Sequence, residues 1–390
     1  MPLSYDALLI TFTMLSAAGE LPGREDYWNI GFPMFAIFAY LFFIFLPAAI
    51  GFAFYRRYRI WRLGKPMPDL GPWKPRMRRA IGVLTRDVLA HRRFVKRELY
   101  AGVMHFFLFW GMTVLLIATT IAGLEDWTHK LMPFDFPTSA FRVQEDFIWD
   151  VFGGGFLLIG IGMAAIRRYF MKPRRLNTFA DDSIFLGLIA ILALTGFMVE
   201  GLRVAGMQAE GTMYWAKWAA PIGYLFSLPF QEMTRDSIGV IHATLWWTHI
   251  GIFGGVLLYL ALNFSKISHI FISPMNIVLR PDRPLGALRA MGNMEELERF
   301  GASDTTDFTW KQLLDFDACT NCGRCQDNCP AYLSGKELSP RKVIQDLRAY
   351  STYRGEQMLR ATAAGEEPPE PESSMIGDFV GQTPVWDCVT

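Results

Sequence analysis

Long apolar segments alternate with basic and polar segments over the first two thirds of the chain. A helix that crosses about 30 Å of hydrocarbon needs roughly 20 residues, and five of the apolar segments are long enough. They cover residues 31–54, 100–123, 147–166, 183–205 and 237–264. Pro33, Pro47 and the glycines at 153–155 lie inside them, as kinks and close-packing points that membrane helices tolerate. The pattern predicts a mainly α chain with a five-helix transmembrane bundle.

The charges of the connecting segments predict an orientation. Residues 55–99 hold fourteen Lys and Arg against three acidic residues, and a second basic segment follows the third span at 167–175. The segments 124–146 and 206–236 are poor in Lys and Arg. By the positive-inside rule the basic segments are cytoplasmic, so the N-terminus lies outside and everything after Phe264 is cytoplasmic. Membrane topology accounts for the basic segments, and no nucleic-acid partner is expected.

Composition supports the same division of the chain. Hydrophobic residues make up 52% and charged residues only 19%, which argues against an ordinary soluble domain. The apolar runs stop near residue 265, and the remainder is polar. We therefore expect an extracytoplasmic segment at 1–30, a membrane domain at 31–265, a linker at 266–308 and a small cytoplasmic α-helical segment at 309–390. The expected location is the bacterial inner membrane, with lipid as a partner.

Four of the five cysteines fall within eleven residues. Cys319, Cys322, Cys325 and Cys329, followed by Pro330, have the spacing of a bacterial ferredoxin run. Three thiolates on one tight loop suit three corners of a 4Fe-4S cube, and in two-cluster ferredoxins the fourth ligates the other cube. A structural zinc site is the alternative, because four thiolates also suit tetrahedral zinc. Zinc ribbons usually use two separated CxxC pairs, so the spacing favours iron and sulfur.

Cys388 lies where a second cysteine run begins and then stops. The sequence therefore predicts an incomplete ferredoxin-like domain, as a portion of a longer protein or with ligands from a second chain. Between the two cysteine segments, Ser339-Pro340 is an N-cap and first-turn pair that predicts a helix through about Tyr350. The Pro/Glu-rich residues 366–374 predict a linker.

Three histidines, His105, His242 and His249, lie inside predicted spans. An ionisable group in a membrane helix is costly without a partner, so each is a functional candidate. Haem b held by imidazoles from two helices is a natural partner. His242 has three interpretations: a haem ligand, a residue lining a quinone pocket, or a hydrogen-bond donor to a neighbouring helix. Glycines at 102, 251 and 255 suit a flat ring and equally suit plain helix packing.

These segments resemble known families. His105 within Gly102–Gly111, His249 in Trp-Trp-Thr-His and His269 in Lys-Ile-Ser-His resemble membrane cytochrome b proteins such as the gamma component of respiratory nitrate reductase. The cysteine run with residues 336–342 looks like the iron-sulfur part of the D-type heterodisulfide reductase family. Their fusion is similar to membrane-bound iron-sulfur oxidoreductases that link electron-transfer flavoprotein to menaquinone. The resemblance implies two haems, with ligand pairs His105/His249 and His91/His269, that feed two clusters.

The leading hypothesis is a quinone-linked oxidoreductase, because redox ligands occur on both sides of the predicted membrane boundary. Electrons would pass between a soluble cytoplasmic protein, such as electron-transfer flavoprotein, and menaquinone through haem b and one or two 4Fe-4S clusters, in either direction. No catalytic residue is predicted. A non-catalytic anchor for a separate soluble reductase, with the cysteines as a relay or a zinc brace, is the alternative. A transporter is a third class, in which a ferredoxin run is unexpected.

Overall fold

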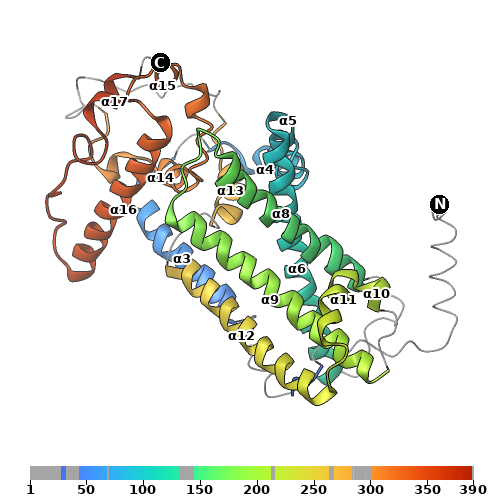
Figure 1. The fold of residues 1–390 in the computed structure, drawn as a ribbon. Helices are drawn as coiled ribbons and strands as arrows, with labels where there is room; N and C mark the ends of the chain where they lie inside the picture. Colours follow the sequence, from blue (N-terminus) through green and yellow to red (C-terminus); the bar gives the residue numbers. More distant parts are fainter. Residues whose placement is uncertain are drawn as a thin grey trace. The chain divides into compact units, whose positions relative to one another are not determined.

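The computed structural model describes residues 28–31, 44–67, 70–131, 145–211, 216–262, 268–282, 284, 295 and 301–388. These residues are mainly helical (Figure 1). The described ranges contain no β-strand, and their only β-type pairings are isolated bridges at Lys65–Thr309 and Ile376–Val380. The prediction of a mainly α chain is confirmed.

The chain forms two compact units. The first unit comprises Met1–Pro47, Phe94–Lys172 and Thr178–Leu257, and the second comprises Ala48–Arg93, Pro173–Asn177 and Leu258–Thr390. The first holds α6 (Leu99–Leu131), η4 (Ile148–Gly155), α8 (Phe156–Ala165), η5 (Ile166–Met171), α9 (Ala180–Ala209), α10 (Ala216–Ala219), α11 (Pro221–Ser227), η6 (Leu228–Phe230) and most of α5 (Arg92–Arg97) and α12 (Arg235–Leu262). The second holds most of α3 (Leu46–Trp61), then α4 (Trp73–Val83), η3 (Leu84–Leu89), α13 (His269–Val278), η9 (Thr305–Asp307), α14 (Trp310–Asp317), η10 (Gln326–Asn328), α15 (Pro330–Leu333), α16 (Pro340–Ala364) and α17 (Gln382–Trp386).

Three helices of the first unit are long and apolar enough to cross a membrane. They cover Leu99–Leu124, Glu145–Met171 and Ala180–Ala209, which matches the second, third and fourth predicted spans. Residues 32–43 of the first predicted span and 263–264 of the fifth lie outside the described residues. The described part of the fifth forms α12, whose 28 residues extend for about 42 Å. The count of five spans and the orientation stay predictions.

Small residues let the membrane-type helices approach closely. A Cβ added at Gly111 of α6 would lie 2.6 Å from the backbone nitrogen of Leu157 on α8. One added at Gly160 of α8 would lie 2.8 Å from the backbone nitrogen of Leu108 on α6. Leu157 and Ile161 of α8 pack with Ile189 and Ala193 of α9 in one buried cluster. Close backbone approach at glycine is how helices gain packing energy in lipid, where no hydrophobic force drives them together.

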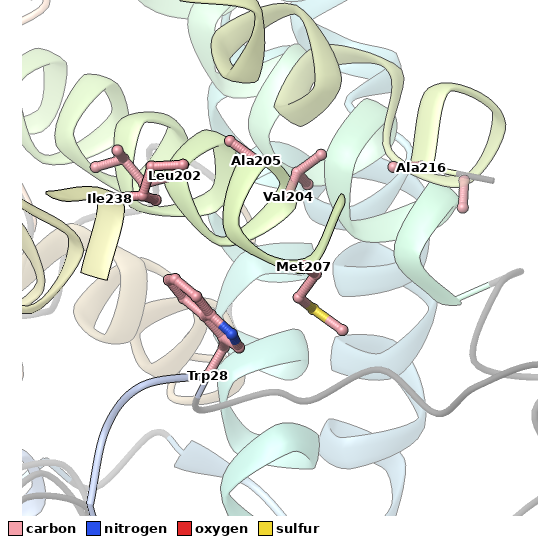
Figure 2. Packing of buried hydrophobic residues seen from close by; sticks show 8 residues of the cluster. Trp28, Leu202, Val204, Ala205, Met207, Ala216 and Ile238 are labelled. Carbon is pink, nitrogen blue, oxygen red and sulfur yellow. The ribbon is translucent and has the colours of Figure 1, made fainter. Parts of the chain in front are cut away.

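A second buried cluster of the first unit joins Trp28 to the C-terminal part of α9 (Figure 2). Leu202, Val204 and Met207 of α9 and Ile238 of α12 are at most 3% exposed there. The Trp28 indole nitrogen donates to a Glu210 carboxylate oxygen at 3.2 Å, so the ring has both an apolar body and a polar partner. This packing brings α9 alongside the start of α12, the helix that carries His242 and His249.

The second unit is built around the helix that precedes the cysteines. Thr309 and Gln312 form a capping box at the start of α14, with the Thr309 hydroxyl accepting from the Gln312 backbone nitrogen at 3.3 Å. Leu313 and Leu314 of α14 pack with Trp61 of α3 and Ile272 of α13 in the buried core. The cysteine loop therefore begins from a well-packed helix end.

Candidate functional site

The cysteines at 319–329 lie on the loop from α14 to α15. Cys319 comes just after α14, and Cys329 directly precedes Pro330, the first residue of α15. Cys322 and Cys325 are exposed, and Cys319 and Cys329 are half-buried. Partial desolvation, followed by the nearby Cys319 and Cys322 sulfurs, raises the pKa of the Cys325 thiol. The three thiols therefore lie within electrostatic range of one another, and iron binding there would have to displace their protons.

The backbone of this loop is shaped for a tight turn. Asn321 and Gly323 have φ values of 58° and 73°, in the left-handed region that glycine adopts without strain. A Cβ at Gly323 would overlap the backbone carbonyl oxygen of Arg175. The Arg175 guanidinium donates to the Cys322 carbonyl oxygen at 2.9 Å, and the Arg175 carbonyl accepts from Arg341 at 2.8 Å. Arg175 therefore contacts the cysteine loop through its side chain and Arg341 of α16 through its carbonyl oxygen.

The donor set fits a 4Fe-4S cube. Within the described ranges, no three His, Cys, Asp or Glu side chains gather in the way that a single metal ion requires. A cube is wider than one ion, and it spreads its soft thiolate ligands over separate iron atoms. Three cysteines on one glycine-containing loop, with the spacing of a bacterial ferredoxin run, suit that arrangement.

Substituting Gly323 by alanine should lower the iron content of the purified protein. The added Cβ would meet the Arg175 carbonyl as well as strain a backbone at φ 73°, so the loop must open. Gly335→Ala is the matched control, because Gly335 has φ 85° and no described atom within 4 Å of an added Cβ. Equal iron content and equal cluster EPR intensity in the two variants would contradict the tight-loop argument.

Cys388 follows α17, near the last residues of the second unit in the chain, and is exposed. Asp387 beside it pairs with Lys336 at 3.4 Å. Lys336 lies in the turn that follows α15, the helix that begins at Pro330. The ion pair therefore holds the segment of Cys388 close to the end of the first cysteine run. Its role as a cluster ligand stays a prediction.

His249, at the centre of α12, is positioned by α9. Its Nδ1 lies 2.9 Å from the Thr195 hydroxyl, which donates its own hydrogen to the Ile191 carbonyl at 2.8 Å. With that hydrogen on Ile191, the hydroxyl can accept from His249 Nδ1, and the corresponding tautomer has its lone pair on Nε2. Gly196 leaves room for the ring, because a Cβ there would lie 3.3 Å from His249 Cε1. This tautomer leaves Nε2 able to coordinate a metal, and the role of His249 as a haem ligand stays a prediction.

His105 lies on α6 in the same unit as His249 and is half-buried. Its ring stacks on Phe94, with the centroids 5.4 Å apart and the planes 4° apart. Gly102 serves packing, since a Cβ there would lie 2.6 Å from the Val95 backbone. Added Cβ atoms at Gly251 and Gly255 would meet no described atom within 4 Å, which agrees with room for a flat group. The structure leaves the His105/His249 pairing as a prediction.

His242 is the most buried of the α12 histidines, at 2% exposure. Its ring meets the edge of Trp28 at 5.1 Å, and its Nδ1 has no hydrogen-bond partner in the part of the chain that the structure describes. Arg203 and Glu200 of α9, paired at 2.5 Å, lie within electrostatic range of it. A buried polar atom without a partner costs about 1–3 kcal/mol, and the three interpretations of His242 stay predictions.

His91 and His269 lie together in the second unit. His91 is 1% exposed, with φ 49°, between η3 and α5. Its Nδ1 is 3.3 Å from the Leu89 carbonyl, which can only accept, so the lone pair is on Nε2. Burial lowers the pKa of His91, so the imidazole is neutral at pH 7, as an iron ligand must be. His269 opens α13, which packs against η3, and the pairing of the two stays a prediction.

Several supporting residues carried no signal in the sequence. Thr195 and Arg175 act across 54 and 147 residues of chain, and no spacing rule connects them to His249 or Cys322. Gly196 follows Thr195 inside an apolar span, where glycine is common. Only the fold shows that these residues surround candidate ligands.

Comparison with known proteins agrees with this geometry. The family model described as "4Fe-4S binding domain" matches residues 310–331, which include all four cysteines of the run. No solved structure matches the chain.

Three relatives match between half and 78% of this chain. The EtfAB:quinone oxidoreductase of Syntrophomonas wolfei is 38% identical over 321 residues, which are 77% of this chain and 43% of that protein. The probable iron-sulfur-binding oxidoreductase FadF of Bacillus subtilis is 26% identical over 333 residues, 78% of this chain and 45% of FadF. The E component of the dihydromethanophenazine:CoB–CoM heterodisulfide reductase of Methanosarcina mazei is 30% identical over 198 residues, 50% of this chain and 66% of that component.

The chain thus spans less than half the length of the first two relatives. Their likeness extends over most of its own residues, and the matched 4Fe-4S domain lies at the predicted position. The resemblance inferred from the sequence is confirmed: over the part that it spans, this chain is a relative of the membrane-bound iron-sulfur oxidoreductases.

Proposed function

We propose that this chain passes electrons between a soluble cytoplasmic redox protein, such as electron-transfer flavoprotein, and menaquinone in the bacterial inner membrane. The observation that carries the proposal is the presence in one chain of a 4Fe-4S domain and of buried imidazoles prepared to bind iron. The 38% identity to a protein named EtfAB:quinone oxidoreductase supports the choice of partners. Both directions of electron flow use the same groups.

The residues of the chain have distinct tasks in this proposal. Cys319, Cys322 and Cys325 hold one cluster, and Cys329 with Cys388 contributes to a second. The clusters and haem b, when bound, supply one-electron carriers between a two-electron donor and a two-electron acceptor. Arg175 braces the cysteine loop and Thr195 orients His249, so that the ligands keep their geometry when the charge on the iron changes.

We assign the two haem pairs His105/His249 and His91/His269 as ligands, and His242 as a contact for the quinone head group. Support for the last comes from the buried, unpartnered Nδ1 within the described ranges, beside Trp28 and the Arg203–Glu200 pair. A quinone carbonyl accepts a hydrogen bond, and its reduction takes up two protons with two electrons. A neutral imidazole can donate to the carbonyl and pass on a proton.

The test uses the full chain in bacterial membranes, reduced with just enough dithionite to develop the haem band and then mixed with an excess of menadione as a soluble menaquinone analogue. The reduced haem b band should disappear on mixing. In His242→Ala the band should form normally but should be reoxidised more slowly, roughly 10²–10⁴-fold if a proton-transfer group has been lost. A haem band that menadione leaves reduced in the unmodified protein would refute the quinone link.

A further inference from the structure

An arginine-rich hub lies beside the first cysteine of the run. Asp317, the last residue of α14 and two positions before Cys319, has a side chain only 5% exposed. Its carboxylate accepts from the Arg57 guanidinium at 2.5 Å, the Trp61 indole at 2.8 Å and Arg348 Nε at 3.0 Å. Arg57 and Trp61 belong to α3 and Arg348 to α16, so three helices of the second unit meet at one carboxylate.

The hub brings two cationic side chains to one carboxylate. The Arg57 and Arg348 guanidinium groups both contact Asp317. Arginine keeps its proton in proteins at neutral pH, so partial burial does not remove these charges. The Arg57 side chain is 11% exposed and that of Arg348 is 22% exposed, so water and salt screen them less than surface cations.

Arg348 is held close to the first cysteine of the run. The Asp317 contact fixes its Nε, α14 packs on α16, and Arg348 lies within electrostatic range of the Cys319 sulfur. An iron-sulfur cluster with its thiolates is an anion that gains one more negative charge on reduction. A fixed cation at this position therefore stabilises the reduced state more than the oxidised state and raises the reduction potential.

We propose that Arg348, held by Asp317, is a positioning and tuning residue that raises the reduction potential of the cluster ligated by Cys319. The inference rests on the cluster of the proposed function, and it adds a role that neither the cysteine spacing nor the relatives assign. A hub of this kind also ties the cluster loop to α3, whose Trp61 lies in the same buried core as Leu314.

The test is a redox titration of the full chain, with the cluster followed by EPR. Arg348→Gln should lower the midpoint potential of the cluster, whereas Arg348→Lys, which keeps the charge, should remain close to the unmodified protein. Arg360→Gln is the matched control, because Arg360 lies on the same helix with a side chain 82% exposed. Asp317→Asn keeps an oxygen that can accept from Arg348 Nε but removes the negative charge of the hub, so it should shift the potential upward.

Opposite shifts in Arg348→Gln and Asp317→Asn separate tuning from mere structural damage, which would move both variants the same way. A full-intensity cluster signal with an unchanged potential in Arg348→Gln would overturn the proposal. If Arg348→Gln fails to take up iron, Asp317→Asn decides, and an unchanged or lowered potential there would overturn it. Failure of the proposed function looks different: the unmodified protein would lack the cluster signal, or would keep it and not react with menadione.

Discussion

Replacing Cys325 with serine should abolish the EPR signal of the first 4Fe-4S cluster. Cys325 shares its loop with Cys319 and Cys322, and their sulfurs influence its pKa, so its removal takes away one corner of the cube. A serine hydroxyl is a harder and far less acidic ligand than a thiol. Loss of a residue that only orients a metal ligand costs roughly 10–100-fold in metal affinity, and loss of the ligand itself should cost more. Electron transfer from a soluble donor to haem b should stop as well.

Cys388→Ser is the matched control for that substitution. Cys388 is also exposed, but it lies after α17 and outside the loop of the first three cysteines. The first cluster should survive in Cys388→Ser, and only signals of a second cluster should change. Retention of the complete signal in Cys325→Ser, or its loss in Cys388→Ser alone, would refute the ligand assignment.

Replacing His249 with alanine should remove about half of the haem b absorption if each histidine pair holds one haem. The Thr195 contact places the His249 lone pair on Nε2, and alanine leaves no replacement ligand. His105→Ala should remove the same spectral component, because the two residues are proposed to share one iron. Dithionite-reduced spectra with an optical redox titration measure both the amount lost and the component affected.

Two comparisons make the haem experiment specific. Thr248→Ala changes an exposed neighbour on α12 and should keep the full absorption. Added imidazole should restore part of the band in His249→Ala, since the small molecule can occupy the space of the missing side chain. If His249→Ala and His105→Ala remove components with different potentials, the two residues do not share a haem.

The helices were the most predictable part of this protein. The apolar runs anticipated the helices at Leu99–Leu124 and Ala180–Ala209 to within a few residues. They could do so because a spanning helix must be apolar on all sides over a fixed length. The N-cap at Ser339 was also predicted, and its hydroxyl accepts from the Lys342 backbone nitrogen at 3.2 Å.

Helix ends and long-range contacts were less predictable. The helix at Ser339 was expected to end near Tyr350, but α16 continues to Ala364. No glycine in the left-handed conformation stops it before Gly365, whose φ is 73°. His91 directly precedes Arg92 and Arg93 in a basic segment, yet it is 1% exposed. Such burial depends on elements far along the chain, and local sequence carries no record of them.

The residues of the candidate site also differ in how well the sequence predicted them. The cysteine spacing alone predicted the 4Fe-4S domain, because one tight loop must supply several ligands and its spacing is therefore local. The supporting residues were not predictable, since Arg57 meets Asp317 across 260 residues. A sequence motif identifies the ligands, whereas only the folded structure identifies the residues that orient and tune them.

Redox-poised EPR and optical titration of the full chain, followed by mixing with menadione, test the central claim most directly. The account predicts a 4Fe-4S signal and a haem b band in the same preparation, with menadione reoxidising both. Zinc in place of iron, a cluster without any haem b, or carriers that menadione leaves reduced would contradict it.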